Sequence, residues 1–161
     1  MTTMPATYPA GTGPDERRLR AAFGRFATGV AFVTTELEDT PLGLIVSSFA
    51  AVSLRPPLVS FCPSRDSLTW QRMRRAGRFT VHVLAAGHGG FARRAASPGA
   101  DRFAQPEVLS DALAAIECEL AAEHAAGDHW IVVGAVRGLR VACDGRPLVY
   151  FAGGFGDFVG H

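Results

Sequence analysis

The stretch from residue 41 to residue 69 constrains the fold of this chain most strongly. It holds three short apolar runs, at residues 44–46, 52–54 and 58–62, which are rich in β-branched and aromatic side chains. Runs of this length and composition are typical of β-strands. The first run ends in Ser47-Ser48-Phe49, and Pro56-Pro57 opens the third. The sequence therefore predicts short strands that turn back on one another, with hydroxyl groups at a strand end that can meet a polar ligand.

The remaining strands and helices follow from periodicity and turn residues. Strands are expected at residues 30–35, 42–49, 58–62, 78–84, 129–141 and 147–151, with turns at Glu38-Asp39-Thr40 and Asp144-Gly145. A helix is expected from Pro14-Asp15 to Gly29, because apolar residues recur at i, i+3, i+4 and i+7. Two more helices are expected at residues 67–76 and 89–95, and a loop at 98–106. Many short strands with few helices predict a mainly β fold, an antiparallel barrel with peripheral helices.

Residues 112–126 carry two conflicting signals. Their Ala, Leu and Glu content favours a helix. However, Ile116, Cys118, Leu120 and Ala122 alternate with Glu117, Glu119 and Ala121, which is the period of a half-buried strand. We interpret the segment as a strand from residue 115 onward.

Composition narrows the class of protein. A chain of 161 residues with 48% hydrophobic content can form one domain with a substantial core, expected over residues 14–161 after a disordered leader at residues 1–13. The net charge of +1 gives no reason to expect nucleic acid or an anionic membrane as partner. The three cysteines form no CxxC motif and are odd in number, which favours reduced thiols and a cytoplasmic location. The first residues do not show the basic-then-apolar pattern of a signal peptide, and no apolar run approaches the roughly 20 residues that a membrane-spanning helix needs.

Four blocks in order resemble the flavin reductase-like family, whose fold is the FMN-binding split barrel. The resemblance extends from about residue 19 to residue 158. The blocks are Phe26-Ala27-Thr28-Gly29-Val30 with Val33-Thr34-Thr35, Ser47-Ser48-Phe49 with residues 52–58, Gly77-Arg78-Phe79 with residues 81–84, and Gly127-Asp128-His129. The likeness is greatest to the reductase components of two-component monooxygenases. It implies an antiparallel split β-barrel, a homodimer, FMN or FAD as the flavin, and NADH or NADPH as co-substrate.

The resemblance also assigns roles to individual residues. Ser47 and Ser48 match positions along the edge of the isoalloxazine ring, and Ser67 and Thr69 match hydroxyl positions that contact the flavin phosphate. Val46, Ser53 and Cys62 are also expected at the flavin site, Cys62 as a packing residue rather than a reactive thiol. Two alternatives stay open from the residues themselves. Ser48 can satisfy a local backbone group instead, and Ser67 or Asp66 can simply cap the helix that follows.

Three further positions are expected to approach the ligands. Arg102 and Phe103 match a loop of the family that faces the cofactor, although a local ion pair with Asp101 is the alternative for Arg102. Phe155 retains an aromatic ring that the family often carries toward the cofactor. His129 is the candidate for nicotinamide positioning, because an imidazole can hydrogen-bond the carboxamide and hold the ring over the flavin. The other histidines lack metal-ligand spacing, so we expect no metal.

The chemistry of hydride transfer from nicotinamide to flavin needs no protein nucleophile. The cofactors perform the reaction, while the protein stacks the two rings and excludes water. Two function classes remain open at this point. One is an NAD(P)H-dependent flavin reductase that supplies reduced flavin to a partner monooxygenase. The other is a flavin-binding protein with little reductase activity or with another substrate. Ile45, Ala152 and Gly154 keep this second class open, because members of the family often carry polar residues at these positions.

Overall fold

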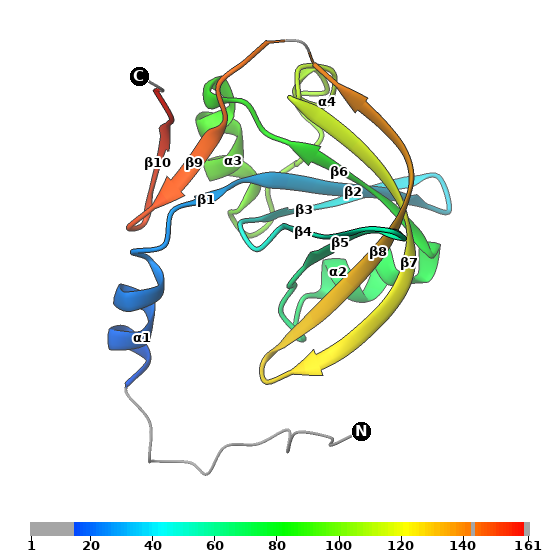
Figure 1. Cartoon of the computed structure of the whole chain (residues 1–161), viewed down its shortest axis with the longest axis horizontal. Coiled ribbons are helices and arrows are strands. Elements are labelled where there is room, and N and C mark those ends of the chain that lie inside the picture. Colours follow the sequence, from blue (N-terminus) through cyan, green and yellow to red (C-terminus); the bar gives the residue numbers. More distant parts are fainter. Residues whose placement is uncertain (1–14, 143, 160–161) are drawn as a thin grey trace.

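The computed structural model describes residues 15–142 and 144–159, so the leader expected over residues 1–13 lies outside the described part of the chain. Within this part, ten strands build two antiparallel sheets, and short helices lie at their periphery (Figure 1). The predicted mainly β fold, an antiparallel split barrel with peripheral helices, is confirmed.

The larger sheet curls into the barrel. In spatial order its strands are β3 (Thr40–Val46), β2 (Ala31–Leu37), β6 (Arg78–Val83), β7 (Ala114–Ala126), β8 (His129–Val141), β5 (Pro57–Phe61) and β4 (Ala50–Leu54). The two edge strands β3 and β4 are consecutive in the chain, joined by residues 47–49. The barrel is therefore split where Ser47 and Ser48 lie. Edge strands leave backbone N–H and C=O groups without a ladder partner on one side.

A smaller sheet and the helices complete the molecule. This sheet joins β1 (Thr28–Gly29), β9 (Leu148–Phe151) and β10 (Gly154–Asp157) in the order β1-β9-β10. The helices are α1 (Glu16–Phe23), α2 (Leu68–Met73), α3 (Gly89–Ala95) and α4 (Glu107–Ser110), with 3₁₀ turns η1 (Arg74–Ala76) and η2 (Ala86–His88). In Figure 1, α1 and the smaller sheet lie beside the barrel rather than within it.

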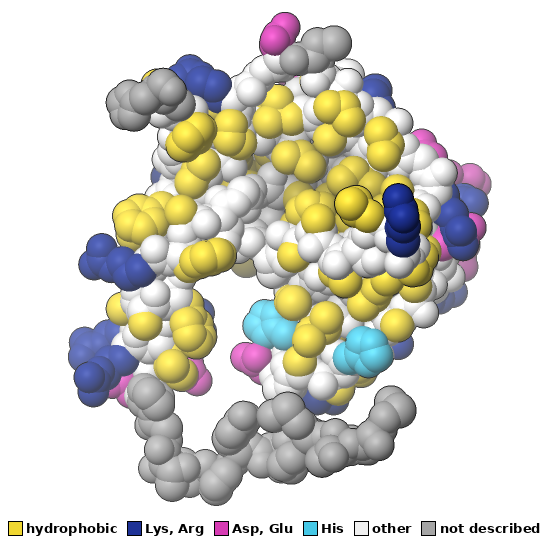
Figure 2. Space-filling model, in the orientation of Figure 1, with side chains coloured by type: hydrophobic (Ala, Val, Ile, Leu, Met, Phe, Trp, Pro, Cys, Tyr) yellow, Lys and Arg dark blue, Asp and Glu magenta, His cyan; other side chains and the backbone are white. Residues whose placement is uncertain are grey.

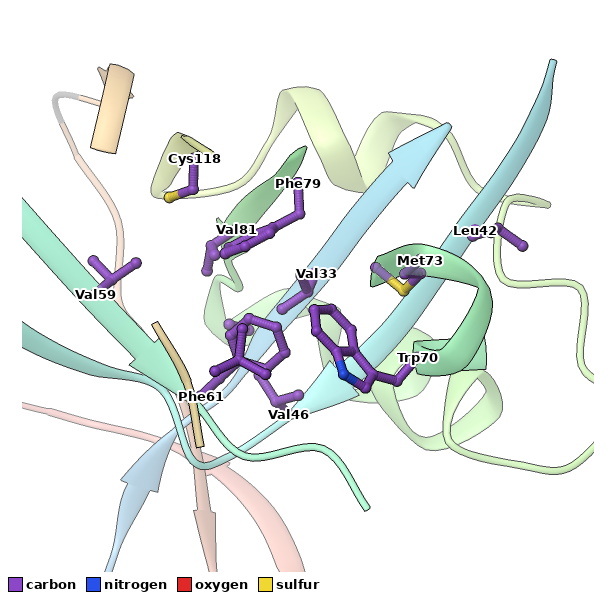
Figure 3. Close-up of a cluster of buried hydrophobic side chains, with 12 residues drawn as sticks. Val33, Leu42, Val46, Val59, Phe61, Trp70, Met73, Phe79, Val81 and Cys118 are labelled. Atoms are coloured by element: carbon purple, nitrogen blue, oxygen red, sulfur yellow. The ribbon is translucent and has the colours of Figure 1, made fainter. Parts of the chain in front are cut away.

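The barrel interior is filled by aromatic and β-branched side chains. Phe61 packs edge-on against Trp70 and against Phe79, with ring centroids 5.3 Å apart in both pairs (Figure 3). Trp70 and Met73 come from α2 and are almost fully buried, so α2 closes one side of the barrel. Burial of side chains of this size contributes roughly 1.5–3 kcal/mol each.

Strand β2 is buried on both faces. Ala31 and Val33 point into the barrel core, while Phe32 packs in a second cluster with Leu84, Leu148 and side chains of α3 and α4. Because successive side chains of a strand point to opposite faces, the continuous apolar run 30–33 fits this position between two cores. The second cluster fixes α3, α4 and the smaller sheet on the outer face of the barrel.

The conflict over residues 112–126 is resolved in favour of the strand. β7 pairs with β6 along one side and with β8 along the other, through Cys118 and its neighbours. Cys118 is buried whereas Glu117 and Glu119 are exposed, as the alternating pattern predicts. Pairing on both sides satisfies the backbone of a segment whose composition favours a helix, so tertiary context overrides propensity here.

Several predicted boundaries are wrong. The first helix ends at Phe23 rather than at Gly29, because residues 28–29 pair with β9 as strand β1. The strand predicted at 42–49 ends at Val46, and residues 47–49 cross to β4. Strand β9 pairs with β1 and β10 rather than with β8, so Asp144-Gly145 does not close a hairpin. The turn at Glu38-Asp39 is confirmed, and both residues have the positive φ of a type I′ hairpin.

Apolar side chains remain exposed on one side of the molecule. Figure 2 shows them gathered over the barrel strands, with an open gap between the barrel and the α1 region. Exposed large apolar residues include Val52 and Leu54 of β4, Leu139 and Val141 of β8, Phe23 at the end of α1 and Phe26 after it. None of the helices in the described ranges is long and apolar enough to cross a lipid bilayer.

Candidate functional site

Ser48, at the split of the barrel, is hydrogen-bonded to Cys62, the residue that follows β5. Its Oγ accepts a hydrogen bond from the backbone N–H of Cys62 at 2.8 Å and lies 3.4 Å from the Cys62 carbonyl oxygen. The local backbone contact that the sequence left open for Ser48 is therefore present. Burial raises the pKa of the Cys62 thiol, while the Ser48 hydrogen bond acts in the opposite direction. A thiol with a raised pKa carries little thiolate at neutral pH, which fits a packing role for Cys62.

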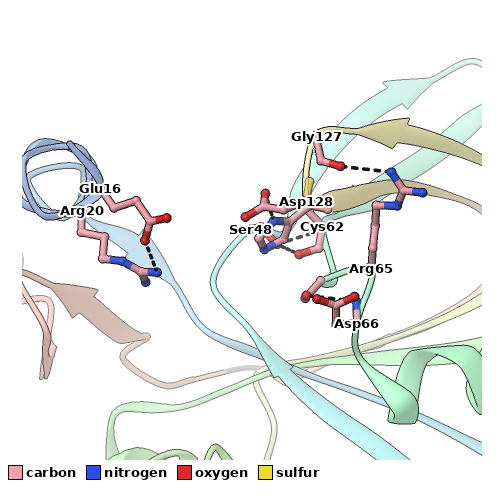
Figure 4. Close-up of polar contacts among 10 residues, drawn as sticks. Glu16, Arg20, Ser48, Cys62, Arg65, Asp66, Gly127 and Asp128 are labelled. Carbon is pink, nitrogen blue, oxygen red and sulfur yellow. Dashed lines mark hydrogen bonds and ion pairs between the residues drawn. The ribbon is translucent and has the colours of Figure 1, made fainter. Parts of the chain in front are cut away.

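His129 lies next to this junction. It begins β8 and forms an isolated bridge with Ser64, two residues after Cys62. Its Nδ1 is 2.8 Å from Oδ1 of Asp128. The hydrogen bond to His129 lowers the pKa of Asp128, and the charge of the imidazole acts in the same direction. Figure 4 shows Ser48, Cys62 and Asp128 grouped together and Arg20 of α1 apart from them, across the opening between the barrel and the α1 region that Figure 2 shows.

The opening contains a cleft of about 630 Å³ between the end of α1, β1 and the β9–β10 turn. Its lining is Arg20, Ala21, Phe23, Gly24, Arg25, Phe26, Thr28, Ser47, Tyr150, Ala152 and Gly153. Small-molecule and cofactor sites are typically about 300–1,000 Å³ and mostly apolar with a few polar groups. This cleft has that size and character, and its described lining includes two arginines but no acidic side chain. The charge suits a ligand that carries phosphate.

One polar atom in the cleft supports a ligand with hydrogen-bonding groups. The Oγ1 atom of Thr28 is buried and has no hydrogen-bond partner among the described residues. Buried hydroxyl groups are normally hydrogen-bonded, so a flavin edge with carbonyl and ring nitrogen atoms fits this position. Thr28, Arg20 and Arg25 were missed as site residues by sequence reasoning, although the block at residues 26–30 was a signal for Thr28.

Two predicted site residues lie on the strands that flank the split. Val46, the last residue of β3, is buried in the barrel core. Ser53 lies in β4, where its Oγ accepts a hydrogen bond from the backbone N–H of Arg55. Ser53 therefore lies on a strand beside the split, and its hydroxyl group makes a local hydrogen bond within the chain.

Thr69, predicted at the flavin phosphate, and Arg102 and Phe103, predicted in a loop that faces the cofactor, lie at the other end of β3. Thr69, Arg102 and Phe103 line a groove of about 230 Å³ together with residues 41–43. Ser47 comes four positions after Gly43, which is about 13 Å along an extended chain. The structure therefore divides the predicted site residues into two groups along β3: Ser47, Ser48, Cys62 and His129 at one end, and Thr69, Arg102 and Phe103 at the other.

Ser67, two residues before Thr69, and the two loop residues Arg102 and Phe103 make contacts within the chain. The Ser67 Oγ accepts a hydrogen bond from the backbone N–H of Trp70 at 3.1 Å and caps α2. Arg102 donates from Nε to the Ala95 carbonyl at 2.8 Å, and Asp101 accepts from the Phe103 N–H rather than from Arg102. The Phe103 ring packs 5.6 Å from that of Phe32. This group therefore supports the loop between α3 and α4.

Phe155 lies on β10, away from the split. Its ring packs 5.3 Å from that of Tyr150, and the Arg93 guanidinium of α3 lies 5.8 Å over it. Tyr150 also lines the cleft. Phe155 therefore supports a wall of the cleft through Tyr150.

A separate groove of about 510 Å³ lies on the outer face of β2, β6, β7 and β8. Glu36, Glu117, Arg78 and Arg137 contribute charges of both signs to it. Phe103 is the single predicted site residue in its described lining. The groove is therefore distinct from the cleft at Ser47.

The family described as "Flavin reductase like domain" matches residues 23–158, so the chain belongs to the flavin reductase-like domain family. The match covers the cleft lining from Phe23 onward and the Asp128-His129 turn.

Individual relatives agree with this membership. The chain is 39% identical over 148 residues to the flavin-dependent monooxygenase, reductase subunit HsaB, of Rhodococcus jostii, covering 86% of this chain and 76% of that protein. It is 41% identical over 155 residues to the FMN reductase (NADH) SmoA of Agrobacterium fabrum, covering 91% and 88%. Among solved structures, the NADH:FAD oxidoreductase SgcE6 of Streptomyces globisporus, in complex with NAD and FAD fragments, superposes with a TM-score of 0.83 at 33% identity, covering 90% of this chain and 93% of that one.

Proposed function

We propose that this protein is an NAD(P)H-dependent flavin reductase that reduces FMN or FAD. The observation that carries the proposal is its 41% identity, over most of both chains, to an FMN reductase that uses NADH. The cleft at Ser47 supports it independently, because its size, arginines and unpaired Thr28 hydroxyl suit a flavin nucleotide. NADH is the favoured co-substrate, since both SmoA and SgcE6 are named for it.

The residues of this chain would hold and orient the two ligands. Bound flavin supplies the hydride-accepting ring, so the protein needs no nucleophile of its own. The Thr28 and Ser47 hydroxyl groups can donate hydrogen bonds to flavin carbonyl oxygens, which gain charge on reduction. Arg20 and Arg25 can pair with phosphate, and the aromatic wall of Phe26 and Tyr150 excludes water.

His129 is proposed to orient the nicotinamide. The lowered pKa of Asp128 keeps it a carboxylate, which can only accept a hydrogen bond, so Nδ1 of His129 carries the hydrogen. In the neutral imidazole, Nε2 is then an acceptor that suits the carboxamide NH₂ of nicotinamide. With its side chain 45% exposed, His129 is accessible to a ligand that enters the opening.

We further propose a partner and an assembly. The reduced flavin would leave for a flavin-dependent monooxygenase, as the name of HsaB indicates for that protein. The protein would act as a homodimer in the cytoplasm, with residues 14–161 as a single domain. The exposed apolar side chains of β4 and β8 and the open cleft support an interface at this side of the barrel.

The proposal is tested by following NADH and NADPH at 340 nm with FMN and with FAD. We expect oxidation of NADH far above a flavin-only control, because the protein aligns two rings that otherwise meet at random. The four combinations also identify the preferred flavin. Rates equal to the control in all four, with flavin binding retained, would instead support the flavin-binding protein without reductase activity.

A further inference from the structure

The turn between β7 and β8 is held by five side chains that the proposed reaction does not use directly. They are Arg65, Trp70, Arg74, Glu123 and Trp130, and we call them the Trp130 brace. The guanidinium groups of Arg65 and Arg74 lie 5.2 and 5.3 Å from the centroid of the Trp130 ring. Cation–π contacts at this distance are attractive, more so when partly desolvated. Trp130 directly follows His129 in β8.

Glu123 anchors the brace to β7. One carboxylate oxygen accepts a hydrogen bond from Trp70 Nε1 at 2.9 Å, and the other lies 2.6 Å from Arg74. The side chain of Glu123 is only 11% exposed. The Arg74 side chain is 39% exposed, so the carboxylate of Glu123 is the member of the pair that is largely removed from water. Loss of Arg74 would leave this carboxylate uncompensated. The ion pair therefore fixes the position of Arg74 over Trp130.

Segment 63–65 holds the turn through three hydrogen bonds, and Arg65 makes two of them. Its backbone N–H donates to the Asp128 carbonyl at 2.9 Å, and its Nη1 donates to the Gly127 carbonyl at 3.3 Å. The Trp130 N–H donates to the Pro63 carbonyl at 2.9 Å. The residues on both sides of His129 are thus fixed by segment 63–65, whereas the side chain of His129 itself remains 45% exposed. Figure 4 shows the contact of Arg65 with Gly127.

We propose that the Trp130 brace is a positioning device for His129, with Arg65 and Glu123 as its positioning residues. The proposal rests on the function inferred above and deepens it. A hairpin tip is exposed and opens easily unless it is tied down. An orienting group that is displaced by about 1 Å can lose a large part of its effect on rate. The brace connects the rigid barrel core, through Trp70, to the residue that meets the nicotinamide.

The test compares Arg65→Ala and Glu123→Gln with Glu119→Gln as a matched control. Glu119 pairs with Arg137 at 2.7 Å and joins the same two strands farther from the turn. We expect both brace variants to raise the KM for NADH about tenfold and to change the Kd for flavin less than about twofold. Glu119→Gln should leave both constants unchanged. A merely structural role would lower Tm without separating the two ligands.

A double-mutant cycle with His129→Ala decides whether the brace acts through His129. In the His129→Ala background, Arg65→Ala should add no further rise in the KM for NADH. An equal rise in both backgrounds, or a parallel loss of flavin affinity, would overturn the proposal. Because Arg65 is exposed, this cycle remains usable if Glu123→Gln does not fold.

The cycle also separates this proposal from the function on which it rests. If His129→Ala alone leaves the KM for NADH unchanged while NADH oxidation persists, the brace proposal fails and the flavin reductase function stands. If the unmodified protein oxidises neither NADH nor NADPH with either flavin, both fail together.

Discussion

At the scale of single residues, protonation of His82 should lower the stability of the folded protein. It lies on β6 with 8% of its surface exposed, and its Nε2 is 3.0 Å from the Thr34 hydroxyl. Its Nδ1 has no partner among the described residues. Burial lowers the pKa of His82, and the positive charge of Arg140 acts in the same direction, against a smaller opposite effect of the Leu109 carbonyl. The imidazole is therefore held neutral in the folded protein.

The sign of the resulting pH dependence follows from linkage. Because the folded-state pKa lies below the unfolded value of about 6.5, the unfolded chain binds more protons as the pH falls below that value. The stability that neutral His82 contributes is present above about pH 6.5 and is lost toward the folded-state pKa. We expect Tm to fall between about pH 7 and pH 5, and His82→Gln to flatten that slope. Burial also lowers the pKa of His88, so part of the slope should persist in the His82→Gln variant. The exposed His124 gives the control variant His124→Gln, and equal slopes in all three proteins would contradict the prediction.

At the scale of elements, α2 offers a test of the two roles left open for Ser67. The helix contributes Trp70 and Met73 to the barrel core, so its N-cap supports the core as well as the helix. Ser67→Ala should lower the free energy of unfolding by about 1 kcal/mol, while Ser67→Asp keeps an N-cap acceptor and should restore it. Urea unfolding measures both. If Ser67 also contacts the flavin phosphate, Ser67→Asp should bind FMN more weakly than the unmodified protein but riboflavin equally well. Ser67→Ala with unchanged stability would contradict the capping role.

The strands also show which parts of the fold can be predicted from the sequence alone. The alternation around Cys118 predicts β7 despite a helical composition, because periodicity reports the burial that tertiary pairing imposes. In contrast, β1 has two residues and β10 consists of Gly154, Phe155, Gly156 and Asp157. Neither is long enough to show a period, and both exist because β9 lies between them. Local sequence therefore predicts the barrel strands and β9, and misses β1 and β10 of the small sheet.

The residues of the candidate site also fall into those that local sequence predicts and those that only the tertiary structure reveals. Ser47, Ser48 and His129 were predicted from motifs whose spacing is visible in the sequence, and the structure brings them to one region through Cys62 and Ser64. Their ligand roles stay predictions. Arg20 and Arg25 line the cleft only because the chain after α1 folds back along β9, a tertiary relation that no local pattern shows. The same holds for Glu123, whose partner Trp70 is 53 residues away.

At the scale of the whole molecule, the exposed apolar face indicates how the chain assembles. Leu54 on the edge strand β4 is 89% exposed, and Phe26 after α1 is 77% exposed. Residues of α1 are all at least partly exposed, so little within a single chain fixes this helix against the barrel. An edge strand with apolar side chains is a liability unless another surface covers it. A two-fold pairing would cover the edge and place a second chain against the open side of the cleft.

The final prediction is that the protein is a homodimer whose contact includes β4. Light scattering at micromolar concentration should give twice the chain mass of 17.1 kDa, with a buried interface above about 2,000 Å². Leu54→Asp should give a folded monomer, because a carboxylate at the centre of an apolar contact loses its hydration without gaining a partner. Leu54→Met keeps the apolar character and should remain dimeric. Flavin affinity should fall in the monomeric variant alone, because the cleft would then lack its second wall. A monomeric mass for the unmodified protein, with flavin still bound, would rule out a site that needs two chains.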